Sequence, residues 1–184
     1  MKILIDLDCV CNNLVEEWIL YLNNKYNLNV KYEDITNYDI TLAFPTLTKE
    51  QIIEPLISQC LVDKYKPIKD SQKYLKRLYE DGHEIRFVTA SHYECMKNKC
   101  EWMLKYYPFI KYTDIWMIHD KQWIDADVLL DDCIDNLVNG KYLGVCYSQP
   151  WNQTYNKKLT INNWKEFYNL IKQLEDNVME RQDA

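Results

Sequence analysis

The apolar residues of this chain follow two different periods. Residues 2–7 (KILIDL) form a short apolar run that ends in an acid, which predicts a buried strand. Asn12 or Asn13 can then cap a helix, because apolar residues recur at helical spacing after them at Val15, Trp18, Ile19 and Leu22. Residues 27–66 lose this period apart from a short helical stretch near Lys49–Gln59.

A regular alternation of helices and strands begins near residue 70. Asp70 or Ser71 can cap a helix that Gly82 ends, since glycine readily adopts the conformation that stops a helix. The pattern then predicts strands at 84–89, 115–118, 128–130 and 142–147, and helices at 92–107 and 163–178. Such alternation favours an α/β fold with a Rossmann-like parallel sheet flanked by helices.

The length of 184 residues suits a single domain that carries a modest insertion. The irregular segment 27–66 is rich in Tyr, Thr and Asp, which sets it apart from the regular pattern that follows. Counting the helix before this segment, we expect residues 16–66 to form a small helical insertion after the first strand. The core domain would then comprise residues 1–15 and 67–184.

Composition and charge exclude several classes of protein. A net charge of -6 with no Lys/Arg block is unsuited to polymeric nucleic acid, because binding a phosphate backbone needs a basic surface. No apolar stretch approaches the ~20 residues of a membrane span, so we expect no membrane contact. Only three glycines are present, and they form no glycine-rich phosphate cradle. Seven scattered cysteines are typical of reduced thiols and predict a cytoplasmic protein.

Functional side chains follow the expected strands at the edge where a parallel sheet gathers them. They are Asp6 and Asp8 after the first strand, Thr89, Ala90 and Ser91 after the second, Lys121 after the third, and Asp131 and Asp132 after the fourth. Clustered carboxylates repel one another unless a hard dication joins them, and oxygen ligands suit Mg²⁺. A metal and a lysine can neutralise a phosphate, and a carboxylate can attack its phosphorus. These residue types therefore favour phosphoryl transfer.

Each of these signals is weak when it stands alone. Two acids at a strand end are common, the segment from Thr89 to Ser91 can simply cap the next helix, and Lys121 can be a solvated charge. The acid pair Asp131 and Asp132 after an apolar strand is more suggestive than these. All of them in this order and context are hard to obtain by chance, so the combination carries the prediction.

The order of these segments resembles the haloacid dehalogenase (HAD) superfamily of phosphohydrolases. Its four motifs look like Asp6–Val10 (DLDCV), Phe87–Ser91 (FVTAS), Lys121 and Leu129–Asp132 (LLDD). Within the superfamily the chain is most similar to the 5'(3')-deoxyribonucleotidases, both in the interval from Lys121 to Asp132 and in a helix with Lys97, Lys99 and Trp102. The 27–66 segment falls where this superfamily places a small helical cap.

The resemblance implies a Mg²⁺-dependent hydrolase that dephosphorylates (deoxy)nucleoside monophosphates through an aspartyl-phosphate. Asp6 would be the nucleophile and Asp8 the general acid/base. Mg²⁺ would be held by the Asp6 carboxylate, the Asp8 backbone carbonyl and Asp132, while Asp131 would support the site. The phosphate-binding and substrate-binding positions of the family match Thr89, Ala90, Ser91 and Lys121.

Aromatic residues of the expected cap would contact the leaving group. The candidates for base contacts are Phe44 and Tyr65, with Trp18 and Tyr38 as further aromatics, and each can equally be a packing residue. The sequence departs from the animal enzymes at Leu14, where those have an aromatic residue, and at Cys9, where they have glycine. These departures leave the base selectivity open. Capped enzymes of this kind are often dimeric, so a homodimer is a further expectation.

Other interpretations predict different behaviour. A HAD phosphatase acting on another small phosphomonoester, such as a sugar phosphate, would share the site but show no preference for nucleotides. A non-catalytic receiver-like phospho-switch would place its acceptor Asp after the third strand and its Lys last, which is not the order found here. A binding-only HAD protein would lack a motif residue, and none is missing.

Overall fold

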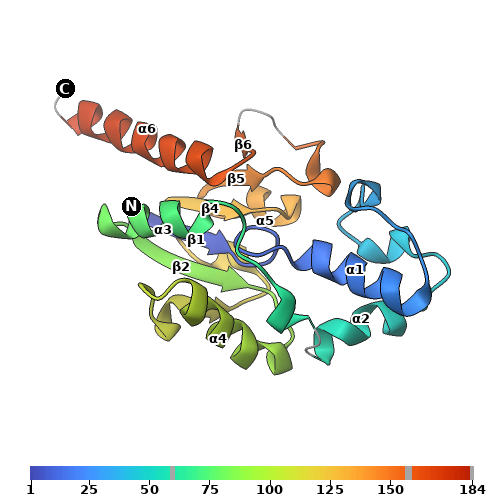
Figure 1. Cartoon of the computed structure of the whole chain (residues 1–184). Helices are drawn as coiled ribbons and strands as arrows, with labels where there is room; N and C mark the ends of the chain where they lie inside the picture. Colours follow the sequence, from blue (N-terminus) through green and yellow to red (C-terminus); the bar gives the residue numbers. More distant parts are fainter. Residues whose placement is uncertain (59–60, 156–158, 183–184) are drawn as a thin grey trace.

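The apolar run at the N-terminus forms the strand β1 (Lys2–Asp6), which lies in the middle of a parallel sheet (Figure 1). The computed structural model describes residues 1–58, 61–155 and 159–182. The strand order is β3-β2-β1-β4-β5-β6, and every neighbouring pair is parallel. The other strands are β2 (Glu84–Thr89), β3 (Ile115–Met117), β4 (Val128–Asp131), β5 (Leu143–Tyr147) and β6 (Thr160–Ile161). The prediction of a parallel α/β sheet is confirmed.

Six α-helices occur in the described part of the chain. They are α1 (Leu14–Tyr26), α2 (Lys49–Ile57), α3 (Ser71–Glu80), α4 (Met96–Tyr106), α5 (Ile134–Val138) and α6 (Trp164–Gln182). None of these described helices combines the length and the apolar character that crossing a membrane requires.

Side chains of β1 alternate between two hydrophobic clusters, because successive residues of a strand point to opposite faces. Ile3 and Ile5 belong to the large cluster, which also holds buried apolar residues of α3, α4 and α6. Leu4 belongs to a smaller cluster on the other face, with Val88, Leu129, Cys146 and Leu137 of α5. Helices therefore cover both faces, although unequally.

Several element boundaries differ from the sequence-based expectation. The helix expected at 92–107 begins instead with a 3₁₀ turn at Tyr93–Cys95, because the His92 side chain accepts a hydrogen bond from the Glu94 backbone N–H there. The sequence pattern did not predict α5 and β6, which have five and two residues and are too short for a recognisable period. The expected end of the second helical stretch at Gln59 lies outside the described residues.

The segment between β1 and α3 lies beyond the carboxyl ends of the strands (Figure 1). Its helices α1 and α2 pack together, and the Trp18 indole Nε1 donates a hydrogen bond of 2.7 Å to the Ile52 carbonyl. The two connections to the core run side by side, because the Asn13 N–H donates to the Lys66 carbonyl and the Asn13 Oδ1 accepts from the Lys66 N–H. The domain division at residues 16–66 stays a prediction.

Candidate active site

The chain turns sharply directly after β1, and this turn places Asp6 and Asp8 at the edge of the sheet. The Cys11 N–H donates to the Leu7 carbonyl at 2.9 Å, which closes the turn. Cys9 has φ of 60° in the left-handed region, where glycine is usually favoured. The side chain of Gln149, a residue that follows β5, donates a hydrogen bond of 2.6 Å to the Cys9 carbonyl and stabilises this conformation.

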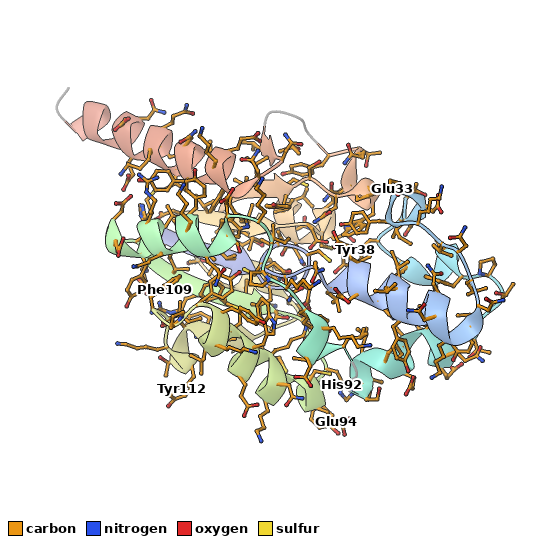
Figure 2. The ribbon with its side chains drawn as sticks, viewed as in Figure 1. Glu33, Tyr38, His92, Glu94, Phe109 and Tyr112 are labelled. Atoms are coloured by element: carbon orange, nitrogen blue, oxygen red, sulfur yellow. The ribbon has the colours of Figure 1, made fainter. Side chains whose placement is uncertain are left out.

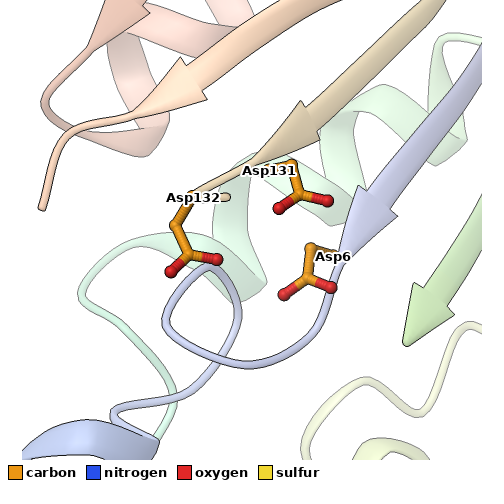
Figure 3. Close-up of side chains that lie close together, drawn as sticks. All are labelled: Asp6, Asp131 and Asp132. Carbon is orange, nitrogen blue, oxygen red and sulfur yellow. The ribbon is translucent and has the colours of Figure 1, made fainter. Parts of the chain in front are cut away.

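Three carboxylates converge at this edge: Asp6, Asp131 and Asp132 (Figure 3). The register of the sheet explains their proximity, because Ile5 pairs with Leu130 and the next residues of both strands are aspartates. One ligand oxygen from each carboxylate lies within 4.8 Å of the others, and all three residues are buried. A cluster of this kind is a candidate site for a divalent cation.

Lys121 lies among these acids, although it is 115 residues from Asp6 in the sequence. Its Nζ forms one ion pair with Asp6 and a second with Asp131 at 2.6 Å. The residue is only 1% exposed. Asp131 is further fixed by the Cys133 N–H at 2.8 Å and by the Asn136 side chain at 3.0 Å. Lys121 and Asp131 thus form a rigid support under Asp6.

The electrostatics of the cluster show an excess of negative charge. Burial raises the pKa of Asp6 to about 7; Lys121 opposes this rise, and the neighbouring charge of Asp131 adds to it. Burial followed by the charges of Asp6 and Asp131 raises the pKa of Asp132 well above its usual value. Burial alone would lower the pKa of Lys121, but Asp6 and Asp131 outweigh it and hold the ammonium charged. One buried ammonium faces three buried carboxylates, so the cluster favours uptake of further positive charge, either protons or a cation.

Asp132 is oriented by residues that follow β5. The Trp151 indole Nε1 donates to Asp132 Oδ2 at 2.9 Å, and the Asn152 amide donates to the Asp132 backbone carbonyl at 2.9 Å. Trp151 and Asn152 are both buried. These two residues could not be predicted from the sequence, because nothing in their spacing connects them with the acid pair.

Asp8 is held from two sides. Lys99 of α4 forms an ion pair with Asp8 Oδ2, and the Asn12 side chain donates a hydrogen bond of 3.1 Å to Asp8 Oδ1. Lys99 is 7% exposed and Asn12 is 1% exposed. Neither residue was predicted to belong to the site. For Lys99 a signal existed, because its helix resembles that of the family named in the sequence analysis.

Thr89 lies at the end of β2, the strand that neighbours β1 on the side opposite to β4. Thr89 and Ala90 both line a cavity that also reaches Asp6, Asp8, Lys121 and Asp132. Ser91 is buried and does not belong to the residues that line this cavity. Of the eight predicted site residues, six line this cavity, and Asp131 supports it through its ion pair with Lys121. Ser91 follows Ala90 directly and is the only one of the eight in neither group.

The cavity has a volume of about 430 Å³ and lies between the core and the insertion. Its core side carries the acids and Lys121, while its insertion side is mainly apolar and aromatic, with Trp18, Ile35, Tyr38, Ile40 and Ile53. Tyr38 is labelled in Figure 2, where the insertion meets the core. A phosphate ester could place its phosphate against the acids and its leaving group against the apolar wall.

Phe44 and Tyr65, the expected base contacts, are not among the residues that line this cavity. They are 1% and 3% exposed and belong to the hydrophobic core. Tyr65 packs edge-on against Trp102 at 6.5 Å between ring centroids. Of the four aromatic candidates, Trp18 and Tyr38 reach the cavity instead, because α1 and the loop before Ile40 face it.

Replacing Lys121 tests the support role by its effect on folding. We expect Lys121→Met to lower the free energy of unfolding by about 3–5 kcal/mol, because it leaves the buried carboxylates of Asp6 and Asp131 without their cation. Urea denaturation in EDTA measures this change. Lys141→Met is the control, since the Lys141 side chain is 82% exposed and should have little effect. Equal stability of the two variants would contradict the support role.

The parallel sheet, with clustered acids and a buried lysine at its carboxyl edge, has the fold of solved structures of HAD-family hydrolases. A HAD family hydrolase from Deinococcus radiodurans R1 has a TM-score of 0.61 at 13% identity, covering 90% of this chain and 92% of that chain. A HAD-superfamily hydrolase from Ehrlichia chaffeensis has a TM-score of 0.55 at 16% identity, covering 94% and 96%.

Sequence relatives identify the family. The model of the family "5' nucleotidase, deoxy (Pyrimidine), cytosolic type C protein" matches residues 1–176. A 5'(3')-deoxyribonucleotidase of Bacillus subtilis (strain 168) is 30% identical over 166 residues, which cover 89% of this chain and 94% of the relative. One from Clostridium acetobutylicum is 27% identical over 183 residues, covering 94% and 95%. The chain belongs to this nucleotidase family and is a phosphoric monoester hydrolase, which confirms the family and enzyme class expected from the motifs.

Proposed function

We propose that the protein is a Mg²⁺-dependent phosphomonoesterase that releases phosphate from (deoxy)nucleoside monophosphates through an aspartyl-phosphate. The observation that carries this proposal is the cavity that joins a buried triad of carboxylates and Lys121 to an apolar, aromatic wall. The relatives named 5'(3')-deoxyribonucleotidase support the substrate class.

The donor set fits a hard dication. The three carboxylates of the cluster offer oxygen ligands and carry more negative charge than Lys121 can balance. Asp6 and Asp132 would hold Mg²⁺ together with the Asp8 backbone carbonyl, whereas both carboxylate oxygens of Asp131 already accept hydrogen bonds within the protein. When bound, the metal would supply positive charge to the oxygens of the transferring phosphoryl group.

Each side chain of the site has its own role in the proposed reaction. The Asp6 carboxylate attacks phosphorus as Asp8 donates a proton to the leaving oxygen, and the P–O bond of the substrate breaks. Asp8 then takes a proton from water, which attacks the aspartyl-phosphate and releases inorganic phosphate. The Thr89 hydroxyl and the Lys121 ammonium bind phosphate oxygens, and the backbone at Ala90 and Ser91 continues this phosphate-binding edge.

The insertion at residues 16–66 would act as a cap over the leaving group. Aromatic and aliphatic side chains on its side of the cavity, chiefly Trp18 and Tyr38, can pack against a nucleobase, for which stacking on aromatic rings is favourable. A cytoplasmic location agrees with the six cysteines that the structure describes as free thiols. The homodimer stays a prediction.

A substrate panel tests the proposal. We expect kcat/KM for deoxynucleoside monophosphates to exceed that for 2-deoxyribose 5-phosphate by at least about tenfold, because only the nucleotides fill the apolar side of the cavity. The matched pair dUMP and 2-deoxyribose 5-phosphate differ at C1, which carries uracil in the first and a hydroxyl in the second, and phosphate release with Mg²⁺ measures both. Equal values for the pair would contradict nucleotide selectivity and would favour a phosphatase of other small esters such as sugar phosphates.

A further inference from the structure

Lys99 is a buried ammonium that contacts the site without lining its cavity. The side chain is 8% exposed, and its Nζ forms an ion pair with Asp8 Oδ2. Asp8 itself lines the cavity. The Asn12 side chain donates a hydrogen bond to Asp8 Oδ1, so both carboxylate oxygens of Asp8 have a partner. Because an ionised carboxylate offers about four lone-pair sites, these two donors leave others available toward the cavity.

The helix that carries Lys99 is itself anchored. Trp102, one turn further along α4, donates a hydrogen bond of 3.1 Å from its indole Nε1 to the Tyr65 carbonyl. Cys95, just before the helix, lies with its Sγ 2.9 Å from the Leu56 carbonyl of α2. Both anchors lie in the segment between β1 and α3. The position of the Lys99 ammonium is therefore fixed by packing on two sides.

We propose that Lys99 is the positioning residue for proton transfer to the leaving group. Resting on the proposed function, in which Asp8 is the general acid, this role assigns to Lys99 the orientation of the Asp8 carboxylate. Asp8 gives its proton to the leaving oxygen as the P–O bond breaks, and the bonding electrons stay on that oxygen. Lys99 transfers no proton and touches no reacting atom, since it approaches Asp8 from outside the cavity.

The leaving group provides a sharp test. A nucleoside oxygen needs a proton as it departs, whereas p-nitrophenolate departs as a stable anion. We expect Lys99→Met to lower kcat/KM for a deoxynucleoside monophosphate by about 30–100-fold, which is the cost of a misplaced acid. For p-nitrophenyl phosphate we expect a change of less than about threefold, because kcat/KM reports the steps up to departure of the leaving group.

Lys97→Met is the matched control. Lys97 lies on the same helix, its side chain is 81% exposed, and its partner is the surface residue Glu101 at 3.8 Å. Both substrates should be hydrolysed at the wild-type rate by this variant. Lys99→Arg keeps the cation and should recover most of the lost nucleotide activity. Lys99→Gln provides the same comparison of substrates if the methionine variant does not fold.

Equal losses on both substrates would overturn the positioning role, because they would indicate a phosphate contact or a general structural defect. Unchanged activity on both substrates would overturn it as well. A different result would refute the proposed function: a wild-type enzyme that hydrolyses p-nitrophenyl phosphate but not deoxynucleotides. The role of Lys99 in nucleotide hydrolysis would then be refuted as well.

Discussion

Asp6→Asn is expected to lower kcat toward deoxynucleoside monophosphates by about 10⁴-fold or more, because the amide cannot attack phosphorus. The substitution keeps the size and shape of a side chain that is 8% exposed, so the packing of the strand end should be preserved. Lys121 also keeps Asp131 as its partner. Loss of activity should therefore come without loss of the fold, which circular dichroism and thermal denaturation can check.

The control for this variant is Asp125→Asn. The Asp125 side chain is 74% exposed and pairs with Lys141 at 3.6 Å, near the start of β4 and thus at the opposite end of the sheet. Its activity should match that of the wild type. Single-turnover release of the nucleoside reports the first chemical step and separates its loss from slow release of phosphate. An Asp6→Asn enzyme that keeps more than about 1% of kcat would contradict the nucleophile assignment.

Asp6 and Asp131 could be predicted because their positions depend on the sheet alone. An aspartate directly after a buried apolar strand must lie at that strand's carboxyl end, and parallel strands gather such ends at one edge. The pairing of Ile5 with Leu130 then places Asp6 beside Asp131 without any contribution from loops. The same reasoning applies to Thr89 at the end of β2.

Contacts between loops and helices could not be predicted in this way. Asp8 and Lys99 are 91 residues apart, and their meeting depends on how α4 packs against the rest of the chain. Trp151 reaches Asp132 from a 3₁₀ turn at Pro150–Asn152, which has no sequence period. Within the insertion, the lack of a regular period gave no indication of which aromatic faces the cavity, so Phe44 and Tyr38 could not be told apart.

Removing divalent cations with EDTA is expected to lower turnover by about 10³-fold or more, and added Mg²⁺ should restore it. The same step should affect stability, because a ligand that binds only the folded protein stabilises it. Mg²⁺ at a hundredfold excess over its Kd should raise Tm by roughly 5–10 °C, which differential scanning fluorimetry measures without relying on activity.

Variants of two neighbouring acids, Asp132 and Asp131, distinguish a metal ligand from a supporting residue in this experiment. Asp132→Asn should abolish the rise in Tm with Mg²⁺, yet its Tm in EDTA should be no lower than that of the wild type, because one of three mutually repelling buried charges is gone. Asp131→Asn should lower Tm in EDTA, since it deprives the buried Lys121 of one of its two partners. Full activity of the wild type in EDTA, or a wild-type Tm that does not rise with Mg²⁺, would contradict the metal site. A wild-type rise of Tm with Mg²⁺ in the Asp132→Asn variant would exclude Asp132 as a ligand.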